Sequence, residues 1–317
     1  MTVKERINVA VAVVTDGDGR VLLSRRPGHV HQGGLWEFPG GKIKAGESVY
    51  EALQRELQEE LGIRVVSARP LITVRHDYPD RKVKLDVWRI NDYQGKPTGC
   101  EEQLIRWVGC GELTDYDFPE ANRPIVTAAG LPDRYLITPE PYADENEFLN
   151  QLSQSVGRND IRLVQLRCRK LHGSALQELA KKTLEVCRRQ GARLLINGSP
   201  DILSAVDADG LHLSSKALSG YSRRPCDPGR LLAASCHNLR ELEQAHRINA
   251  DFVVLSPVLA TPDHPDVLPL GWSKFKALTD CSVLPVYALG GMTAGTLSQA
   301  WQHGGQGIAA IRAFWGS

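Results

Sequence analysis

Acidic residues beside a glycine-rich turn could bind a hard divalent cation. Glu56, Glu59 and Glu60 lie in a run of strong helix formers, in which residues three and four apart share one face. The turn that precedes this run contains Gly41, whose bare carbonyl could add a further ligand. Carboxylate and carbonyl oxygens are the ligands that Mg²⁺ and Mn²⁺ prefer. A solvated acidic helix face is the alternative interpretation of an isolated pair of glutamates.

The complete spacing of this stretch favours the cation site. The chain fits Gly-x5-Glu-x7-Arg-Glu-apolar-x-Glu-Glu-x-Gly-apolar without a gap. The matching residues are Gly41, Glu47, Arg55, Glu56, Leu57, Glu59, Glu60, Gly62 and Ile63. Seven fixed identities, at about one in fifteen each, coincide by chance at a given start with a probability on the order of 10⁻⁸. This is the pattern of the Nudix hydrolases, which the N-terminal half resembles.

A helix and several strands must position these residues. The helix is predicted over residues 47–61, because helix formers run up to Gly62 and apolar residues from Val49 to Leu61 recur at every fourth position. The Pro-Gly-Gly segment at 39–41 is expected to continue neither a strand nor a helix. An Asp-Gly-Asp-Gly sequence predicts a hairpin turn between the first two strands. Strands are expected at residues 7–15, 21–24, 71–75, 82–90 and 105–108.

Loops outside this motif resemble those of the MutT branch of the Nudix hydrolases. The similar segments are residues 27–31, 37–42, 78–81, 95–97 and 117–124. The resemblance spans about residues 5–130 and implies an α/β/α sandwich with a mixed sheet. It also implies an enzyme that hydrolyses oxidised purine nucleoside triphosphates, such as 8-oxo-dGTP, to a monophosphate and pyrophosphate. Such an activity cleans the nucleotide pool, protects DNA from damaged bases and avoids mutation.

The MutT resemblance also implies roles for individual residues. Expected ligands of Mg²⁺, or of Mn²⁺, are Gly41, Glu56, Glu59, Glu60 and Glu101. Glu56 or Glu101 would act as the base, and Arg55 would orient Glu56. Expected substrate contacts are Arg26, His31, Phe38, Lys42, Asp80, Arg81 and Asn122. Judged from the residues alone, Asn122 is equally well a helix cap. A solvated surface residue is the alternative for Arg26, but the neighbouring motif favours a phosphate contact.

A second domain is predicted after a proline break, so that residues 1–131 and 134–317 form separate units. Apolar, strand-like runs in this half are residues 135–137, 161–166, 193–196, 210–213, 231–235, 252–258, 284–289 and 307–311. Helical patterns lie between them, at residues 174–189, 238–247 and 293–303 among others. This alternation predicts a (β/α)₈ TIM barrel.

The strand ends of this barrel resemble the thiamine phosphate synthase and TenI family. The similar segments are residues 164–167, 195–197, 209–213, 234–237, 251–257 and 288–291. Ligand contacts implied by the resemblance are Gln165, Arg167, Asn197, Gly290 and Gly291, although tight packing explains the glycines equally well. The synthase's metal-binding aspartates are replaced by Gly198 and the segment 214–217, its lysine is missing from 261–264, and Pro257 replaces the TenI histidine. The barrel is therefore expected to be a degenerate relative that lacks synthase activity.

Composition limits the remaining possibilities. A net charge of +1 argues against a polymeric nucleic acid as partner, and no apolar run is long enough to cross a membrane. The seven cysteines are scattered, as is typical of a reduced, cytoplasmic protein. The apolar run at 9–14 is interpreted as a strand and not as a targeting signal. The oligomeric state is not predicted. The alternative function is hydrolysis of a thiamine precursor or of damaged thiamine diphosphate. In that case the barrel would bind or sense a thiamine-related phosphate.

Overall fold

The computed structural model describes residues 6–28, 32–141, 144–261 and 266–316. The chain forms two compact units, Met1–Leu131 and Pro132–Ser317. Each unit has its own buried core. In the described ranges, every helix is too short or too polar to span a lipid bilayer.

The N-terminal unit contains a mixed sheet and a smaller antiparallel sheet. In the larger sheet the order is β4-β1-β6-β5, with β1 parallel to β6 and the other pairs antiparallel. The second sheet has the order β3-β2-β7. The strands are β1 (Arg6–Val14), β2 (Val21–Arg25), β3 (Trp36–Glu37), β4 (Gly40–Lys42), β5 (Arg64–Asp77), β6 (Lys82–Gln94) and β7 (Ile105–Val108).

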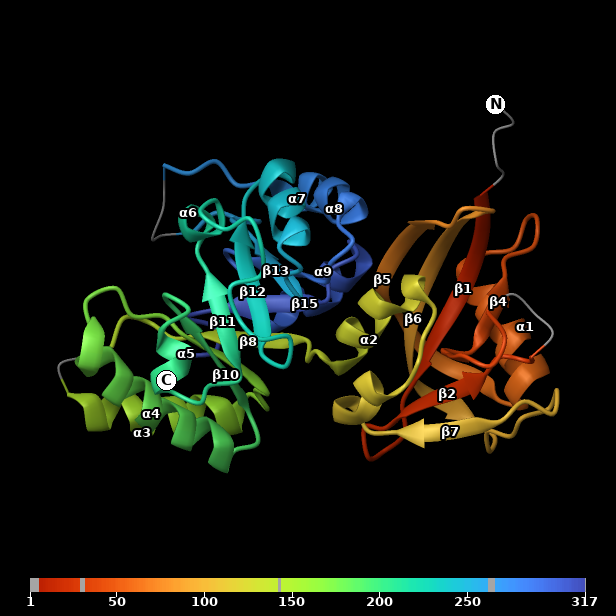
Figure 1. Ribbon diagram of the computed structural model, residues 1–317, viewed down its shortest axis with the longest axis horizontal. Coiled ribbons are helices and arrows are strands. Elements are labelled where there is room, and N and C mark those ends of the chain that lie inside the picture. The colour runs from red at the N-terminus through yellow and green to blue at the C-terminus, as the bar shows by residue number, and fades with distance from the viewer. Residues whose placement is uncertain (1–5, 29–31, 142–143, 262–265, 317) are drawn as a thin grey trace. The chain divides into compact units, whose positions relative to one another are not determined.

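Two helices cover opposite faces of the mixed sheet (Figure 1). Ala10, Ala12 and Val14 of β1 pack with the apolar side of α1 (Val49–Leu61). Val11 and Val13 point the other way, into the cluster that contains α2 (Arg123–Gly130). Alternate residues of one buried strand thus serve two cores, and the predicted α/β/α sandwich is confirmed.

Helix α1 owes its limits to local sequence signals. Its N-cap Ser48 accepts from the Glu51 N–H at 3.2 Å, and the Glu51 carboxylate accepts from the Ser48 N–H at 2.8 Å, a reciprocal capping box. Gly62 ends the helix with a left-handed φ of 68°. The predicted helix is confirmed, except that it begins at Val49, because the capping serine excludes Glu47 from the first turn.

One expectation for local structure was wrong and another was confirmed. The segment 39–41 does not simply interrupt regular structure, because β4 begins at Gly40 and pairs with β1. A Cβ at Gly40 would lie 2.1 Å from the Ala10 carbonyl oxygen, so this strand pairing requires a glycine. The predicted turn between the first two strands is present, because Thr15 and Val21 form an antiparallel bridge and the Asp16 N–H donates to the Arg20 carbonyl at 3.0 Å, although β1 and β2 then enter different sheets.

The C-terminal unit is a closed barrel of parallel strands, as predicted (Figure 1). The strands are β8 (Arg134–Ile137), β9 (Leu163–Leu166), β10 (Arg193–Asn197), β11 (Gly210–Leu213), β12 (Leu231–Cys236), β13 (Phe252–Leu255), β14 (Val286–Leu289) and β15 (Gly307–Ala310). The outer helices are α3 (Glu145–Arg158), α4 (Gly173–Arg189), α5 (Ile202–Ala205), α6 (Ser215–Leu218), α7 (Leu239–Arg247), α8 (Gly271–Cys281) and α9 (Leu297–Gln302). The strands are almost wholly buried on both faces, which explains their continuous apolar runs.

Candidate active site

Four glutamates from three segments form an acidic cluster around Glu60, near the C-terminal end of α1. Glu56 and Glu60 belong to the helix, Glu37 ends β3, and Glu101 lies on the loop before β7. Burial, together with the negative charges of the other three, raises the pKa of Glu60 to about 8. The Gly40 N–H opposes this shift by donating to Glu60 Oε2 at 3.2 Å. The cluster therefore concentrates negative charge that a cation would neutralise.

The polarity of α1 strengthens this negative potential. Partial negative charge collects at the C-terminal end of a helix, where the last carbonyl groups have no partner within the helix. Glu59 and Glu60 stand at that end, and the last turn of Val49–Leu61 contains no basic residue. Acidic side chains thus occupy the end of α1 where they are least stable, and this arrangement favours cation binding.

Gly41 lies directly against the carboxylate of Glu56. A Cβ at position 41 would stand 2.2 Å from the Glu56 Cδ and 2.3 and 2.4 Å from its two oxygens. Any side chain at this position would therefore displace the carboxylate. The close approach of a functional group explains this glycine.

Arg55 orders the acids that surround it. Its guanidinium donates to both carboxylate oxygens of Glu47 at 2.8 and 2.9 Å, and to Glu56 Oε1 at 2.6 Å. It also donates to Glu59 at 3.3 Å and to the Lys42 carbonyl at 3.1 Å. The hydrogen bonds from Arg55 hold the pKa of Glu47 down, at about 2. Arg55 thus ties the loop before α1 to the catalytic face of the helix.

The donor set fits a hard divalent cation. Among the residues that the structure describes, no three His, Cys, Asp or Glu side chains meet at chelating distance as they stand. The reason is that Glu56 is turned onto Arg55 and Glu60 onto the Gly40 N–H. The candidate ligands nevertheless offer only oxygen atoms, carry an excess of negative charge and surround a position that admits no side chain.

The 3-10 helix η2 (Glu120–Asn122) and the segment before it pack against Phe38 and Tyr78. Phe38 stacks on Phe118 with ring centroids 5.4 Å apart, and the Ala121 N–H donates to the Tyr78 hydroxyl at 3.3 Å. Asn122 precedes α2, yet its side chain makes no capping hydrogen bond, and it is 9% exposed. The cap interpretation of Asn122 therefore does not account for this residue, whose amide can donate and accept.

Inside the barrel, polar side chains form a chain of hydrogen bonds. Asn197 donates to Gln165 Oε1 at 3.5 Å, and Gln165 donates to the Tyr135 hydroxyl at 3.2 Å. This hydroxyl lies 3.1 Å from Nδ1 of His212, whose Nε2 lies 2.8 Å from the Ser235 hydroxyl. Two candidate ligand contacts, Gln165 and Asn197, therefore bond to each other within the barrel.

His212 is the buried link in this chain. Both ring nitrogens of His212 thus have a hydroxyl partner, so the neutral imidazole can donate at one nitrogen and accept at the other. Burial and then the charge of Arg167 lower the pKa of His212 to about 3. The ring is therefore neutral at physiological pH.

Gly290 and Gly291 follow β14 with left-handed φ values of 98° and 68°. A Cβ at Gly290 would lie 2.8 Å from Pro257, and one at Gly291 would lie 2.7 Å from Leu259. Close packing against the loop after β13 thus accounts for both glycines without a bound phosphate.

Comparisons with known proteins agree with both halves of the chain. The NUDIX domain family matches residues 10–128, and the thiamine monophosphate synthase family matches residues 134–314. The chain is a fusion of a Nudix hydrolase domain with a thiamine monophosphate synthase (TenI) family barrel.

Each of the following relatives matches one of the two domains over most of its own length. An 8-oxo-dGTP diphosphatase of Escherichia coli is 34% identical over 122 residues, which are 38% of this chain and 95% of that protein. A CTP pyrophosphohydrolase of the same species is 36% identical and covers 37% of this chain and 87% of its own length. A putative thiamine-phosphate synthase 2 of Aquifex aeolicus is 35% identical, over 58% of this chain and 98% of its own. The N-terminal domain is thus a Nudix hydrolase domain related to MutT.

The expected substrate contacts of the Nudix domain have differing environments. Arg26 forms an ion pair with Glu37, while Asp80 and Arg81 pair with each other at 2.7 Å on the β5–β6 turn. Phe38 is 3% exposed and belongs to the core. His31 lies outside the described residues.

Two further residues in the Nudix site were not assigned by sequence reasoning. Glu37 contributes to the potential at Glu60, and burial raises the pKa of Glu37 despite its pairing with Arg26. Gln103 bonds to both α1 and the Glu101 loop. The signal for Glu37 was its position in the Glu-Phe-Pro-Gly-Gly segment, whereas nothing local distinguishes Gln103.

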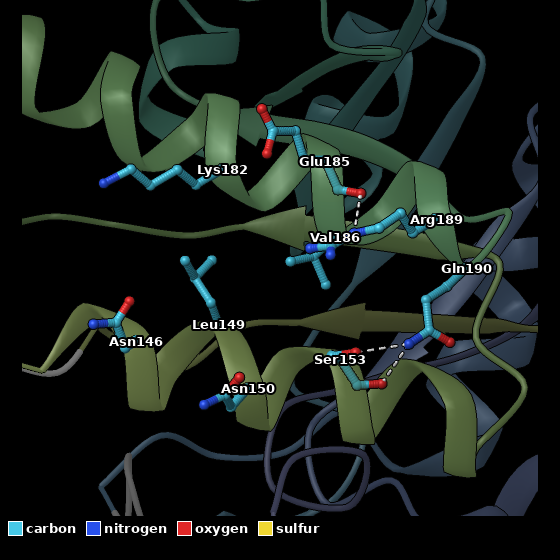
Figure 2. Close-up of a pocket in the computed structure, with 9 residues that line it drawn as sticks. All are labelled: Asn146, Leu149, Asn150, Ser153, Lys182, Glu185, Val186, Arg189 and Gln190. Atoms are coloured by element: carbon cyan, nitrogen blue, oxygen red, sulfur yellow. Dashed lines mark hydrogen bonds between the residues drawn. The ribbon is translucent and has the colours of Figure 1, made fainter.

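A groove on the outer wall of the barrel domain offers no comparable chemistry. Figure 2 shows it between α3 and α4, with Leu149 and Val186 among its lining residues. Gln190 donates across it to the carbonyl and hydroxyl oxygens of Ser153, at 2.9 and 2.8 Å. These bonds join the two helices, and we assign the groove a structural role.

Proposed function

We propose that the Nudix domain hydrolyses oxidised purine nucleoside triphosphates such as 8-oxo-dGTP and thereby cleans the nucleotide pool. The observation that carries the proposal is the Glu56 carboxylate packed against Gly41, in a cluster whose charges, those of Glu56 and Glu101 included, act on Glu60. In the reaction, water attacks the β-phosphorus and the bond to the α–β bridging oxygen breaks. The bridging oxygen leaves with the nucleoside monophosphate, and the water oxygen remains on pyrophosphate.

The acidic residues are assigned the roles of metal ligands and of a base. The residues that would hold Mg²⁺ or Mn²⁺ are Gly41, Glu56, Glu59, Glu60 and Glu101. When bound, such an ion neutralises triphosphate charge and makes an attacking water more acidic. Glu56 or Glu101 accepts the proton of that water. Arg55 aims Glu56 by the 2.6 Å hydrogen bond described above.

Separate residues are assigned to the phosphates and to the base of the substrate. Arg26 and Lys42 would bind phosphate oxygens, and Arg26 must then exchange its bond to Glu37 for one to the substrate. Asn122 would read the edge of the purine, which its unused capping capacity supports. The remaining proposed contacts near the base are His31, Phe38, Asp80 and Arg81. Because one relative is a CTP pyrophosphohydrolase, the identity of the base is the main question for experiment.

For the barrel domain we propose a binding role towards a small phosphate ester related to thiamine. Its candidate contacts are Gln165, Arg167, Asn197, Gly290 and Gly291. The expected metal-binding aspartates of a synthase are absent, since Gly198 follows β10 and Ser214 caps α6 by accepting from the Ala217 N–H at 3.2 Å. Calorimetry of the full-length protein with thiazole phosphate tests this role, and no heat at millimolar ligand would refute it.

The deciding experiment measures hydrolysis by the full-length protein with Mg²⁺ on 8-oxo-dGTP, dGTP, CTP and thiamine diphosphate. Pyrophosphate is followed for the triphosphates, and thiamine monophosphate with phosphate for thiamine diphosphate. Glu56→Gln is the control, because it keeps the shape of the side chain and removes its charge. We expect preference for 8-oxo-dGTP, abolished by this substitution. Equal turnover of dGTP, or turnover of CTP or thiamine diphosphate alone, would overturn the purine assignment.

A further inference from the structure

We propose that Gln103 is a positioning residue of the Nudix reaction. Its amide ties the backbone of Glu101 to the carbonyl of Glu60, and so holds the loop carboxylate beside the acids of α1. The inference rests on the proposed metal-dependent hydrolysis. Gln103 itself touches neither a candidate ligand's carboxylate nor the expected substrate.

Both ends of the Gln103 amide are used. Nε2 donates to the Glu60 carbonyl oxygen at 2.8 Å, and Oε1 accepts from the Glu101 N–H at 2.8 Å. The first bond reaches the helix and the second reaches the loop, although 43 positions separate Gln103 from Glu60. One side chain therefore joins two segments that each supply a candidate ligand.

The loop is fitted to the end of α1 by further contacts. The Cys100 N–H also donates to the Glu60 carbonyl, at 2.9 Å, and the Thr98 N–H donates to the Leu61 carbonyl at 3.1 Å. These donors satisfy carbonyl groups that have no partner within the helix. A Cβ at Gly99 would lie 2.1 Å from the Gln103 carbonyl oxygen, so the loop closes tightly on itself. Its backbone is therefore held at both ends of the turn.

Glu101 needs such support. The residue is exposed, and the next residue, Glu102, adopts a left-handed φ of 61° that is unfavourable for a side chain other than glycine. Without the Gln103 bond, the exposed turn would regain conformational freedom, and ordering it again would oppose cation binding. The amide bridge thus fixes the backbone from which the Glu101 side chain extends.

The test compares Gln103→Ala with the substitution of a matched glutamine on α1, Gln54→Ala. Gln54 Nε2 donates to the Val65 carbonyl at 2.9 Å and to the Tyr50 hydroxyl at 3.1 Å, away from the acids. Gln54→Ala therefore removes a similar side chain-to-backbone bond without involving the site. Binding of Mn²⁺ to the full-length protein is measured from the electron paramagnetic resonance signal of the free ion, and kcat/KM is measured with 8-oxo-dGTP.

We expect Gln103→Ala to weaken Mn²⁺ binding and to lower kcat/KM by about 10–100-fold each. Gln54→Ala should change neither by more than about 3-fold. In a Glu101→Gln background, Gln103→Ala should add no further loss, because the residue acts through Glu101. Losses that multiply, or equal losses from the two glutamine substitutions, would overturn the inference. If the wild type binds Mn²⁺ but does not hydrolyse 8-oxo-dGTP, the substrate proposal fails and the binding data alone still decide the role of Gln103.

Discussion

Substitutions of the two neighbouring glycines of β4 distinguish a loss of activity from a loss of stability. Gly41→Ala adds a methyl group that would stand 2.2 Å from the Glu56 carboxyl carbon, whereas ordinary contact begins at 3.4 Å. The carboxylate must therefore retreat by about 1 Å. A misplacement of this size in a reacting group lowers the rate by about 100-fold, or about 2.7 kcal/mol of transition-state stabilisation. The clash involves the end of a flexible side chain, so we expect less than about 1 kcal/mol of lost stability.

Gly40→Ala is the matched control. Gly40 has a φ of 145°, and its added methyl group would lie 2.1 Å from the Ala10 carbonyl oxygen and 2.9 Å from the Val11 Cα. These atoms belong to the backbone of a paired strand and cannot move aside. We expect a loss of roughly 3 kcal/mol or more in the free energy of unfolding.

The assay combines kcat/KM for pyrophosphate release with urea unfolding of each variant. Gly41→Ala should unfold at nearly the wild-type urea concentration while losing activity. Full activity in this variant would mean that the observed place of the Glu56 carboxylate is irrelevant to the reaction. Unfolding as early as in Gly40→Ala would mean that position 41 serves the fold and not the site.

Three further outcomes are expected. Arg55→Lys keeps the charge but loses the paired donors to Glu47, so kcat should fall at least about 10-fold while the circular dichroism spectrum stays unchanged. His212 has a folded pKa of about 3 and an ordinary value of 6.5, so below about pH 6.5 only the unfolded chain binds its proton and stability falls. Between pH 7 and pH 5, the free energy of unfolding measured in urea should fall by about 2 kcal/mol more for the wild type than for His212→Gln. An equal fall in both proteins would contradict this reasoning. Removing divalent cations with EDTA should abolish pyrophosphate release and lower the unfolding temperature of the Nudix domain, and Mg²⁺ but not Na⁺ should restore both.

Features that depend on neighbouring residues could be predicted from the sequence. The end of α1 at Gly62 was predicted, while its start was placed two residues too early although the capping signal of Ser48 is also local. The spacing from Gly41 to Gly62 identified the candidate ligands because one helix face carries most of them. The barrel was equally predictable, since buried parallel strands produce apolar runs that alternate with helices.

Features that depend on distant residues could not be predicted. The need for glycine at position 40 arises from the backbone of β1, and Gly290 meets Pro257. Likewise, the pairing of Arg26 with Glu37 and the bond from Gln103 to Glu60 join segments that only the fold brings together. Sequence patterns report local periodicity and turn chemistry, and they carry little information about which remote group a polar side chain will find.

The pairing of β8 with β15 has a consequence for synthesis on the ribosome. The first strand of the barrel is hydrogen-bonded to its last, with Ile308 opposite Arg134 and Ala310 opposite Leu136. The barrel therefore cannot close until nearly all of its sequence has been translated, which at 5–20 residues per second takes roughly ten to thirty seconds. During that interval β8 presents an unpaired edge, a hazard for association between nascent chains. The Nudix domain, whose contacts are complete by Leu131, can fold during the same interval.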